Sequence, residues 1–238
     1  MVAFTGAGIS AESGVPTFRD AQTGLWARYD PTELATPQAF RRNPKLVWDW
    51  YAWRRELVER AQPNPGHRAL ARMERLVPEM AVITQNVDGL HQRAGSRRVI
   101  ELHGSLRRYR CFDCGHKLAL DEAAPPGPEG VPRCPKCGGL IRPDVVWFNE
   151  PLPSDAWQEA QAWMRRADIV LIIGTSGVVW PAAGLPLEAK EHGALLVDIN
   201  PNESAFGPVV DFVLRGPAGQ VLPALVRATW PEAADTGP

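Results

Sequence analysis

The chain opens with Val2-Ala3-Phe4-Thr5-Gly6-Ala7-Gly8-Ile9-Ser10 after its first methionine, and there a short apolar run changes abruptly into a glycine-rich motif. Short apolar runs bounded by turn residues are typical of buried strands. The same change occurs four more times, so we predict five strands that each end in a polar motif. The later apolar runs are 81–83, 99–102, 169–173 and 195–199, and the motifs that follow them are 84–88, 103–104, 174–176 and Asn200.

Helical patterns separate the predicted strands, which gives an α/β fold built from β-α-β units. If the strands are parallel, all five motifs lie at the carboxyl edge of one sheet, where open α/β sheets bind ligands. We therefore expect one site from motifs that are far apart in sequence. The predicted helices cover 44–62, 66–76, 154–166, 181–192 and 219–229.

Two stretches interrupt the alternation of strands and helices. Residues 107–142 hold all four cysteines and a segment rich in proline and glycine, so we predict a small inserted module. Residues 17–75 are too long for an ordinary connection between two strands, and we predict a helical insertion there. Two insertions over one sheet would create a cleft between a large and a small lobe. The large domain would comprise 1–16, 76–106 and 143–230, followed by a frayed tail at 231–238.

Composition excludes several classes of protein. The chain has 238 residues and a formal net charge of −1, which gives no reason to expect nucleic acid or an anionic membrane as a partner. No apolar stretch reaches the roughly 18 residues of a membrane span, and no signal peptide is recognisable. We expect a cytoplasmic monomer in which the cysteines form no disulfides.

The four cysteines occur as two pairs with the spacing of a zinc site. Cys111 and Cys114 form one Cys-x-x-Cys pair, and Cys134 and Cys137 form the second after nineteen residues. Each pair can bind one ion through two thiolates, and both pairs together complete a tetrahedron. Because no coordination position stays open, we predict one structural zinc ion. A redox pair or isolated buried thiols are the alternatives.

Two motifs at the predicted edge suit a nucleotide. The backbone amides around Gly6, Ala7 and Gly8 could approach a pyrophosphate. However, Ala11 stands where a GxGxxG motif has glycine, and a plain turn explains these residues equally well. Asn200 could bind a ribose, although asparagine also commonly terminates strands.

One of the five histidines stands out as a candidate general base. His103 follows an apolar strand at the predicted edge, and its pKa range suits proton transfer near neutral pH. Asn86 and Asp88 follow the neighbouring strand and strengthen this interpretation. The other histidines considered are His67 at a helix start, His91 on a short helix and His192 at a helix end, and we expect structural roles for them.

Taken together, these motifs resemble those of sirtuins, in the same order and over nearly the whole chain. The resemblance implies an NAD-consuming protein-lysine deacylase with a Rossmann-type large domain and a small zinc module. Each motif alone is unspecific, but the combination is highly specific. The matching motifs are Gly6-Ala7-Gly8-Ile9-Ser10, Gly14-Val15-Pro16-Thr17-Phe18-Arg19, Thr84-Gln85-Asn86-Val87-Asp88, His103-Gly104, the paired Cys-x-x-Cys motifs and Gly174-Thr175-Ser176.

The resemblance also implies roles for residues of the predicted site. His103 would be the general base, with Asn86 beside it. The acyl oxygen would attack C1′ of the nicotinamide ribose, nicotinamide would leave, and His103 would help a ribose hydroxyl attack the resulting imidate, so that the acyl group ends on ADP-ribose. The residues implied to hold NAD are Gly6, Ala7, Gly8, Ser10, Thr17, Phe18, Arg19, Gln85, Asn86, Asp88, Gly174, Thr175, Ser176, Asn200 and Ala218.

Tyr51 and Arg54 bear on the choice of acyl group. They are three residues apart and share one face of the predicted helix, where a phenol and a guanidinium can grip a carboxylate. The pair resembles the Tyr-x-x-Arg signature of sirtuins that remove succinyl and malonyl groups. The alternative is an amphipathic helix whose aromatic residues only pack.

Residues 145–150, Val-Val-Trp-Phe-Asn-Glu, resemble the sirtuin strand that pairs with the substrate peptide. Val146, Phe148 and Asn149 would then contact substrate. Many relatives have glycine where Asn149 stands, so the sequence leaves open the local backbone here and the fit of the peptide.

Two other functions fit the same motifs. An NAD-dependent mono-ADP-ribosyltransferase would share the NAD site and the first bond cleavage, and only the reaction products separate it from a deacylase. A zinc ribbon on a non-catalytic NAD-sensing fold would leave bound NAD intact when acyl peptide is present. Asn86, His103 and the peptide strand favour the deacylase, whose partners would be acyl-lysine proteins or peptides.

Overall fold

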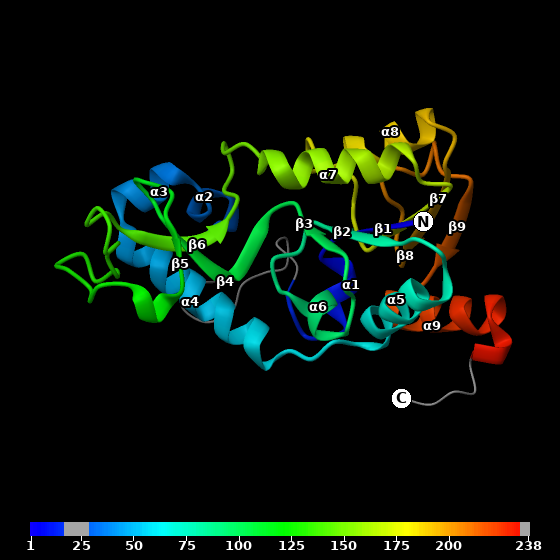
Figure 1. Ribbon diagram of the computed structural model, residues 1–238, viewed down its shortest axis with the longest axis horizontal. Coiled ribbons are helices and arrows are strands. Elements are labelled where there is room, and N and C mark those ends of the chain that lie inside the picture. The colour runs from blue at the N-terminus through cyan, green and yellow to red at the C-terminus, as the bar shows by residue number, and fades with distance from the viewer. Residues whose placement is uncertain (17–28, 234–238) are drawn as a thin grey trace.

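A computed structural model of the chain describes residues 1–16 and 29–233. It has a large lobe that contains both described ends of the chain and a small lobe at the other end of the long axis (Figure 1). Thr17, Phe18 and Arg19, which the sirtuin resemblance assigns to NAD, lie outside the described residues. No helix in the described ranges is long and apolar enough to cross a lipid bilayer.

The large lobe is built on a parallel sheet of six strands, in the order β3-β2-β1-β7-β8-β9. All five predicted strands are confirmed, and the order reverses between β1 and β7, as in a Rossmann-type sheet. The sixth strand, β9, was not predicted because its apolar run is short and lies at an exposed edge. The strands are β1 Val2–Thr5, β2 Ala81–Thr84, β3 Val99–Glu101, β7 Ile169–Ile173, β8 Leu195–Asn200 and β9 Phe212–Arg215.

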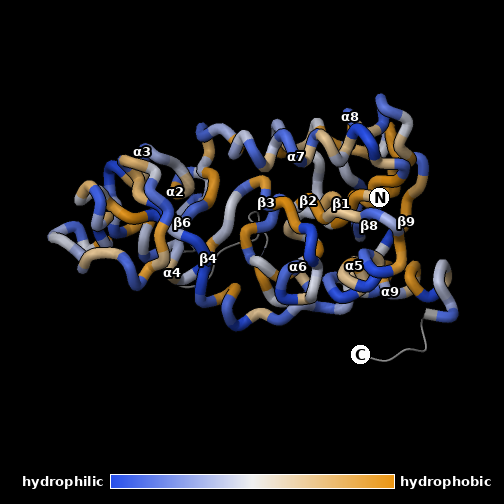
Figure 2. Tube along the Cα trace, viewed as in Figure 1, coloured by the Kyte–Doolittle hydropathy of each residue, from blue (hydrophilic) through white to orange (hydrophobic). Residues whose placement is uncertain are grey.

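Helices cover both faces of this sheet, because alternate residues of a strand point to opposite sides. On one face, Phe4 and Ile172 pack with residues of α7 (Ser154–Arg165) and α8 (Gly184–Glu191). On the other, Ala3 and Leu171 pack with α5 (Pro65–Leu76) and α9 (Ala218–Thr229). The strands are therefore apolar on both faces, and Figure 2 shows this as hydrophobic colour along β1, β2 and β3.

Four helices begin with the same two-residue signal, a polar residue followed by proline. The polar side chain accepts a hydrogen bond from the first turn, while proline fixes a helical φ where no intrahelical N–H is needed. These caps explain why the helices start where they do. The caps are Asp30 for α2 (Pro31–Leu34), Thr36 for α3 (Pro37–Arg42), Asn43 for α4 (Pro44–Arg60) and Asn64 for α5.

The predicted helices agree with the structure to within one or two residues, except for α8. It begins at Gly184 and not at 181, because residues 181–183 form a turn in which Gly184 N donates to Pro181 O at 2.9 Å. Two four-residue helices, α1 (Gly8–Ala11) and α6 (Leu90–Arg93), complete the large lobe. Helix α5 lies within the range predicted as a helical insertion, yet it packs against the large sheet, so the inserted helices are α2, α3 and α4.

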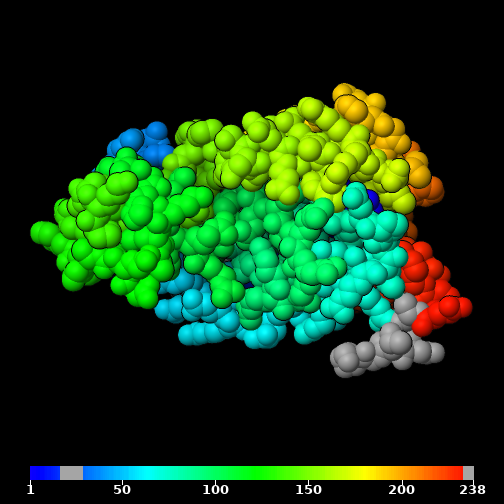
Figure 3. All heavy atoms as spheres, in the orientation of Figure 1, coloured from blue at the N-terminus to red at the C-terminus, as the bar shows by residue number. Residues whose placement is uncertain are grey.

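The small lobe combines these inserted helices with an antiparallel sheet in the order β5-β4-β6. The strands are β4 (Gly104–Cys111), β5 (Lys117–Leu118) and β6 (Ile141–Val145), and a 3-10 turn covers Leu120–Glu122. Strands β4 and β6 continue beyond the predicted module boundaries at 107 and 142. In the space-filling view, the residues between them form the end of the molecule farthest from the termini (Figure 3).

Candidate active site

The five polar motifs meet at the carboxyl edge of the large sheet. Four of them are hydrogen-bonded to a neighbouring motif, and Gly174 bonds the strand residue just before Asn200, so the site is one connected structure. The bonds are Gln85 Nε2 to Thr175 Oγ1 (3.0 Å), His103 Nδ1 to Gln85 O (3.0 Å), Asn86 Nδ2 to Gly6 O (3.1 Å), Gly8 N to Gly174 O (2.8 Å) and Gly174 N to Ile199 O (3.1 Å).

The glycine motif after β1 serves mainly to bring two loops together. Gly6 N donates to Ile173 O at 2.9 Å, and Gly8 N donates to Gly174 O. A Cβ on Gly8 would lie 2.7 Å from the Cα of Gly174, so only glycine fits. The amides of Gly6 and Gly8 are therefore engaged within the protein, and the pyrophosphate contact of this motif stays a prediction. Within the part of the chain that the structure describes, only Ala7 of the three keeps its amide outside the backbone hydrogen bonds.

His103 has the geometry of a general base in its neutral form. Its Nδ1 lies 3.0 Å from the carbonyl oxygen of Gln85, and a carbonyl can only accept, so Nδ1 carries the proton. The lone pair is then on Nε2. Burial lowers the pKa of His103, while the hydrogen bond to Gln85 opposes this shift. The imidazole is consequently unprotonated and able to accept a proton at neutral pH.

Asn86 and Asp88 are held in place by the buried hydroxyl of Ser10. Ser10 Oγ donates to Asp88 Oδ2 at 2.7 Å and accepts from Asn86 Nδ2 at 3.2 Å. Leu90 N donates to the second carboxylate oxygen of Asp88 at 2.9 Å. Burial raises the pKa of Asp88, and these two donors oppose the shift without cancelling it. A buried carboxylate and a fixed amide of this kind suit polar groups of a nucleotide.

Two buried histidines lie behind this network, and sequence reasoning gave them no part in it. His67 Nε2 lies 3.4 Å from Ser10 Oγ, whose only proton goes to Asp88, so His67 must donate there. Its Nδ1 accepts from Asn64 N at 3.3 Å, and burial lowers its pKa to about 4. His91 packs edge-on against His67 with ring centroids 4.9 Å apart. Both are therefore neutral structural groups, and His67 lies one hydrogen bond behind Ser10, the donor to Asp88.

Tyr51 and Arg54 lie beside one another at the predicted acyl pocket. Burial raises the pKa of Tyr51 to about 12, against the opposing charge of Arg54, so the phenol stays protonated. Burial lowers the pKa of Arg54, whose guanidinium carbon lies 5.0 Å from the centre of the Trp50 ring. The Tyr51 ring stacks on Trp147 with centroids 6.2 Å apart. The sequence pattern alone could not show this stacking.

The segment predicted as a peptide-binding strand is a strand only at its first residue. Strand β6 ends at Val145, and 146–150 form a loop and turn, so the prediction of a continuous strand is wrong. Val146 N donates to His103 O at 2.9 Å, and Phe148 N donates to Ala35 O at 2.9 Å. Asn149 has a φ of 69°, a left-handed conformation that favours glycine and that asparagine tolerates.

A partly buried ion pair fixes this turn, and no sequence pattern indicated it. Glu150 accepts from Trp147 N at 2.9 Å and from Arg142 Nη1 at 2.5 Å. Arg142 is almost wholly buried, and its guanidinium carbon lies 3.2 Å from the centre of the Trp147 ring. Arg110 extends the pair with a contact of 3.3 Å to Glu150. The position of Trp147, beside the predicted acyl pocket, depends on this clamp.

The residues assigned to the adenosine half lie at the ends of β7, β8 and β9. Thr175 accepts from Gln85, and Ser176 O accepts from Ala205 N at 2.9 Å. Asn200 is buried and donates through its amide nitrogen to Asp198. Ala218 is the first residue of α9 and is buried against Gly66. Acceptors, donors and an apolar helix start are thus available along one edge, which fits a dinucleotide.

The four cysteines form a site with the dimensions of bound zinc. Their Sγ atoms all lie within 4.8 Å of one another, with Cys111 to Cys137 at 3.5 Å and Cys114 to Cys134 at 3.9 Å. Zn–S bonds of about 2.3 Å arranged as a tetrahedron require sulfurs about 3.8 Å apart. The four thiolates therefore suit one closed structural zinc site.

Both zinc-binding turns have the same local structure. Gly115 and Gly138 follow the second cysteine of each pair, with φ of 70° and 76°. Gly115 N donates to Cys111 O at 3.1 Å, and Gly138 N donates to Cys134 O at 2.9 Å. Glycine is required there because the chain turns through the left-handed region. The repeated Cys-x-x-Cys-Gly pattern is a signal that could have strengthened the prediction.

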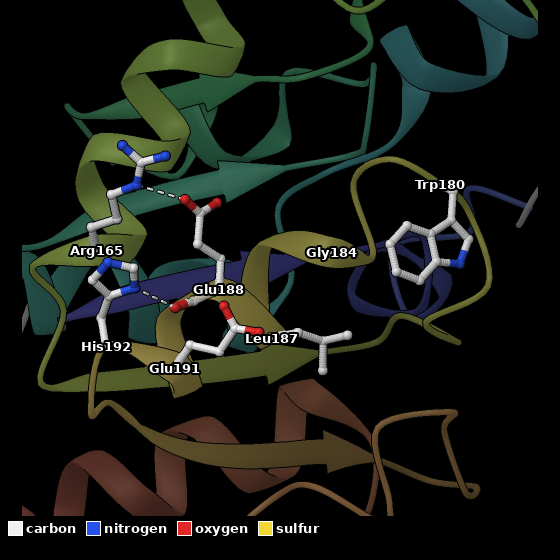
Figure 4. Close-up of a pocket in the computed structure, with 7 residues that line it drawn as sticks. All are labelled: Arg165, Trp180, Gly184, Leu187, Glu188, Glu191 and His192. Carbon is white, nitrogen blue, oxygen red and sulfur yellow. Dashed lines mark hydrogen bonds and ion pairs between the residues drawn. The ribbon is translucent and has the colours of Figure 1, made fainter.

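A separate cavity of about 560 Å³ lies on the outer face of α7 and α8 (Figure 4). It contains none of the predicted site residues. Trp180 forms one end of this cavity, with its ring over Gly184. Farther along the cavity, Glu188 accepts a hydrogen bond from Arg165 Nε at 2.6 Å. His192 Nδ1 lies 2.8 Å from Glu188 O, which confirms its expected place at a helix end.

Comparisons with known proteins agree with this geometry. The Sir2 family model matches residues 6–181. The NAD-dependent protein deacylase 2 of Pyrobaculum aerophilum is 59% identical over 226 residues, which cover 95% of this chain and 89% of that protein. A Sir2 homologue in complex with NAD has a TM-score of 0.90 at 53% identity and covers 98% of this chain and 90% of its own. A variant of a Sir2 homologue with 2′-O-acetyl ADP ribose has a TM-score of 0.88 at 52% identity, covering 99% of this chain and 93% of its own.

Proposed function

This chain belongs to the Sir2 family and is an NAD-dependent protein deacylase, and we propose that it transfers acyl groups from lysine to ADP-ribose with a preference for succinyl and malonyl groups. The family resemblance stated from the sequence is confirmed. When bound, NAD supplies the ADP-ribosyl acceptor and a nicotinamide leaving group. A solved Sir2 homologue with 2′-O-acetyl ADP ribose supports this product by similarity.

One observation carries the proposal, namely the short connection between the base and the acyl pocket. The carbonyl oxygen of His103 accepts from Val146 N at 2.9 Å. The next residue, Trp147, stacks on Tyr51, which lies beside Arg54. The general base, the predicted peptide-binding segment and the carboxylate-binding pair are thus adjacent along one short path.

The residues at the carboxyl edge of the large sheet have different roles in the reaction. Neutral His103 accepts a proton through Nε2 from a ribose hydroxyl, because Gln85 holds its Nδ1 proton. The fixed amide of Asn86 orients the sugar from the side of Gly6. Asp88, held by Ser10, offers a carboxylate to the carboxamide of nicotinamide. A network that is already hydrogen-bonded before substrate arrives needs little reorganisation during reaction.

The pH dependence of deacylation should reflect the lowered pKa of His103. Activity needs neutral imidazole, which is present above the pKa and lost as pH falls through it. Because burial lowers that pKa, we expect the acid limb of kcat/KM to be centred below the ordinary histidine value of about 6.5. An acetyl-lysine peptide should be used, since it adds no carboxylate that titrates nearby. A limb centred at 7 or above would contradict the assigned state of His103.

The acyl pocket favours a group that ends in a carboxylate. Arg54 remains a cation despite its lowered pKa, and Tyr51 remains a donor because its pKa is about 12. A succinyl carboxylate can take a charge-assisted pair from Arg54 and a hydrogen bond from Tyr51. An acetyl group carries no carboxylate, so it gains neither of these contacts.

Removing Arg54 should therefore abolish the preference. In Arg54→Met, kcat/KM for a succinyl-lysine peptide should fall roughly 30- to 150-fold, mainly through KM, with little change for the acetyl peptide. Tyr51→Phe should act in the same direction but less strongly, since it removes a neutral donor. Steady-state kinetics on matched acetyl and succinyl peptides measure both effects.

Arg55→Met is the matched control on the same helix. Arg55 lies over the ring of Tyr109, 5.6 Å from its centre, and loses the same charge when replaced by methionine. In Arg55→Met, the ratio of succinyl to acetyl activity should stay at the wild-type value. If Arg54→Met and Tyr51→Phe reduce activity on both peptides equally, the two residues only pack the helix, and the proposed preference is wrong.

The product itself decides between deacylation and transfer of ADP-ribose to protein. We expect mass spectrometry to show nicotinamide, free lysine peptide and acyl-ADP-ribose after incubation with NAD and succinyl-, malonyl- or acetyl-lysine peptide. A peptide that gains the mass of ADP-ribose and keeps its acyl group would overturn the proposal.

A further inference from the structure

The amide of Asn200 has one fixed direction, and Asp198 determines it. Asp198 lies two residues earlier on β8 and is completely buried. Its Oδ1 accepts from Asn200 Nδ2. An ionised carboxylate can only accept hydrogen bonds, so the amino group of Asn200 must face it and Oδ1 of Asn200 must face away. Within 1–16 and 29–233, no residue donates a hydrogen bond to Oδ1 of Asn200.

Arg215, from the neighbouring strand β9, holds Asp198 in turn. Arg215 pairs with Asn200 in the strand register, and its Nη1 lies 3.0 Å from Asp198 Oδ2. The same nitrogen donates to Asn202 O at 2.9 Å. Each carboxylate oxygen of Asp198 thus has its own partner, and the partly exposed guanidinium of Arg215 is held against this carboxylate through Nη1. A buried carboxylate without such a partner would be costly.

We propose that Arg215 and Asp198 are positioning residues that make Asn200 an obligate hydrogen-bond acceptor and thereby select NAD over its 2′-phosphorylated form. The inference rests on the proposed placement of the adenosine ribose at Asn200. Ribose hydroxyls can donate to the outward Oδ1 of Asn200. A phosphate ester at this position has no proton to donate and brings negative charge towards Asn200 and Asp198. Asp198 already balances the charge of Arg215 through the ion pair at Nη1, so Arg215 offsets little of the added negative charge.

The direct test is the binding of ADP-ribose and of ADP-ribose 2′-phosphate, measured by isothermal titration calorimetry on the full chain. Wild type should bind ADP-ribose on the order of 100-fold more tightly or better, since a site built for hydroxyl donors rejects a ligand that lacks them. In Asp198→Asn, the new amide can donate or accept, so Asn200 can turn its amino group outward, and Arg215 is released. The ratio of the two affinities should shrink about tenfold or more.

The double variant Asp198→Asn/Arg215→Met tests the second half of the inference. If the released guanidinium contacts the phosphate, its removal should weaken binding of the phosphorylated ligand about tenfold relative to the single variant. Asp211→Asn is the matched control, because Asp211 pairs with Lys190 at the opposite, amino end of β9 and loses the same charge. Its affinity ratio should equal that of wild type.

Two results would overturn the inference. One is a wild-type chain that binds both ligands equally, and the other is an Asp198→Asn variant that weakens both by the same factor. If Asp198→Asn does not fold, as judged by circular dichroism, Asn200→Ser serves instead and should reduce the ratio by weakening ADP-ribose alone. These measurements use no acyl peptide, so they fail or succeed separately from the proposed acyl preference.

Discussion

Replacing His103 with alanine is expected to lower deacylation by roughly 10²–10⁴-fold, the usual effect of losing a general base. The physical reason is that Nε2 of His103 carries the lone pair that can accept a proton, because the hydrogen bond to Gln85 fixes the proton on Nδ1. Binding of ADP-ribose should remain within a few-fold of wild type, because His103 lies apart from the groups assigned to adenosine. Stopped assays of peptide deacylation and calorimetric titration give the two numbers.

His192→Ala is the matched control for this variant. It removes the same side chain from an exposed helix end, where the imidazole only bonds Glu188 O. Its activity should be close to that of wild type. Deacylation by His103→Ala at a near-normal rate would show that another group or a water accepts the proton. His91 would not be a good replacement, because burial holds its pKa well below the ordinary value and its Nε2 is bonded to Thr5 at 2.9 Å.

Loss of zinc should have the second largest effect, and it should act through the fold. Cys134→Ser removes one of four thiolates from a closed site, and structural zinc binding is worth about 10–16 kcal/mol in small peptides. The apolar cluster around the site contains few residues besides Tyr109, Leu118 and Ile141. We therefore expect the small lobe to lose its ordered structure and deacylation to be lost indirectly.

Elemental analysis and hydrogen exchange measure these outcomes. Wild type should contain one zinc per chain, and Cys134→Ser should contain little and exchange rapidly over β4 and β5. Lys136→Ser is the control, since Lys136 lies in the same turn but is exposed and supplies no ligand. A metal-free preparation with full activity and normal hydrogen exchange would show that zinc does not stabilise the small lobe.

Aromatic contacts within the small lobe give the zinc site a second consequence. Phe112 lies between Cys111 and Cys114, and its ring packs 5.1 Å from Phe40 and 6.1 Å from Trp147. Trp147 in turn forms the wall beside Tyr51. A disordered zinc turn would thus remove a contact that supports the acyl pocket, which is why the small lobe matters for a reaction at the edge of the large sheet.

Elements with strong local signals were predictable from the sequence. Strands such as Ile169–Ile173 are uninterrupted apolar runs that end at glycine or a polar residue, and those features lie within consecutive residues. The two Cys-x-x-Cys pairs are equally local. Strand β9 was missed because Phe212-Val213-Leu214 is short and exposed, so its place in the sheet depends on pairing with β8 and not on its own pattern.

The chemical assignment was partly predictable and partly not. The sequence predicted that His103, Asn86 and Asp88 gather at one edge, because parallel strands bring their carboxyl ends together. It could not predict that the amides of Gly6 and Gly8 donate hydrogen bonds to Ile173 O and Gly174 O at the end of β7. Nor could it show that residues 146–150 leave the strand, since the clamp between Glu150 and Arg142 that holds them forms only in the folded small lobe.

The sequence by itself determined the family, the order of the motifs that follow the strands, and the zinc ligands. Each of these depends on short motifs whose residues are close together along the chain. Only the tertiary structure decided the directions of the hydrogen bonds. Gln85 fixes the tautomer of His103, and Asp198 with Arg215 fixes the amide of Asn200. These partners come from different elements, and a donor or acceptor has no preferred direction until a second group lies within about 3 Å.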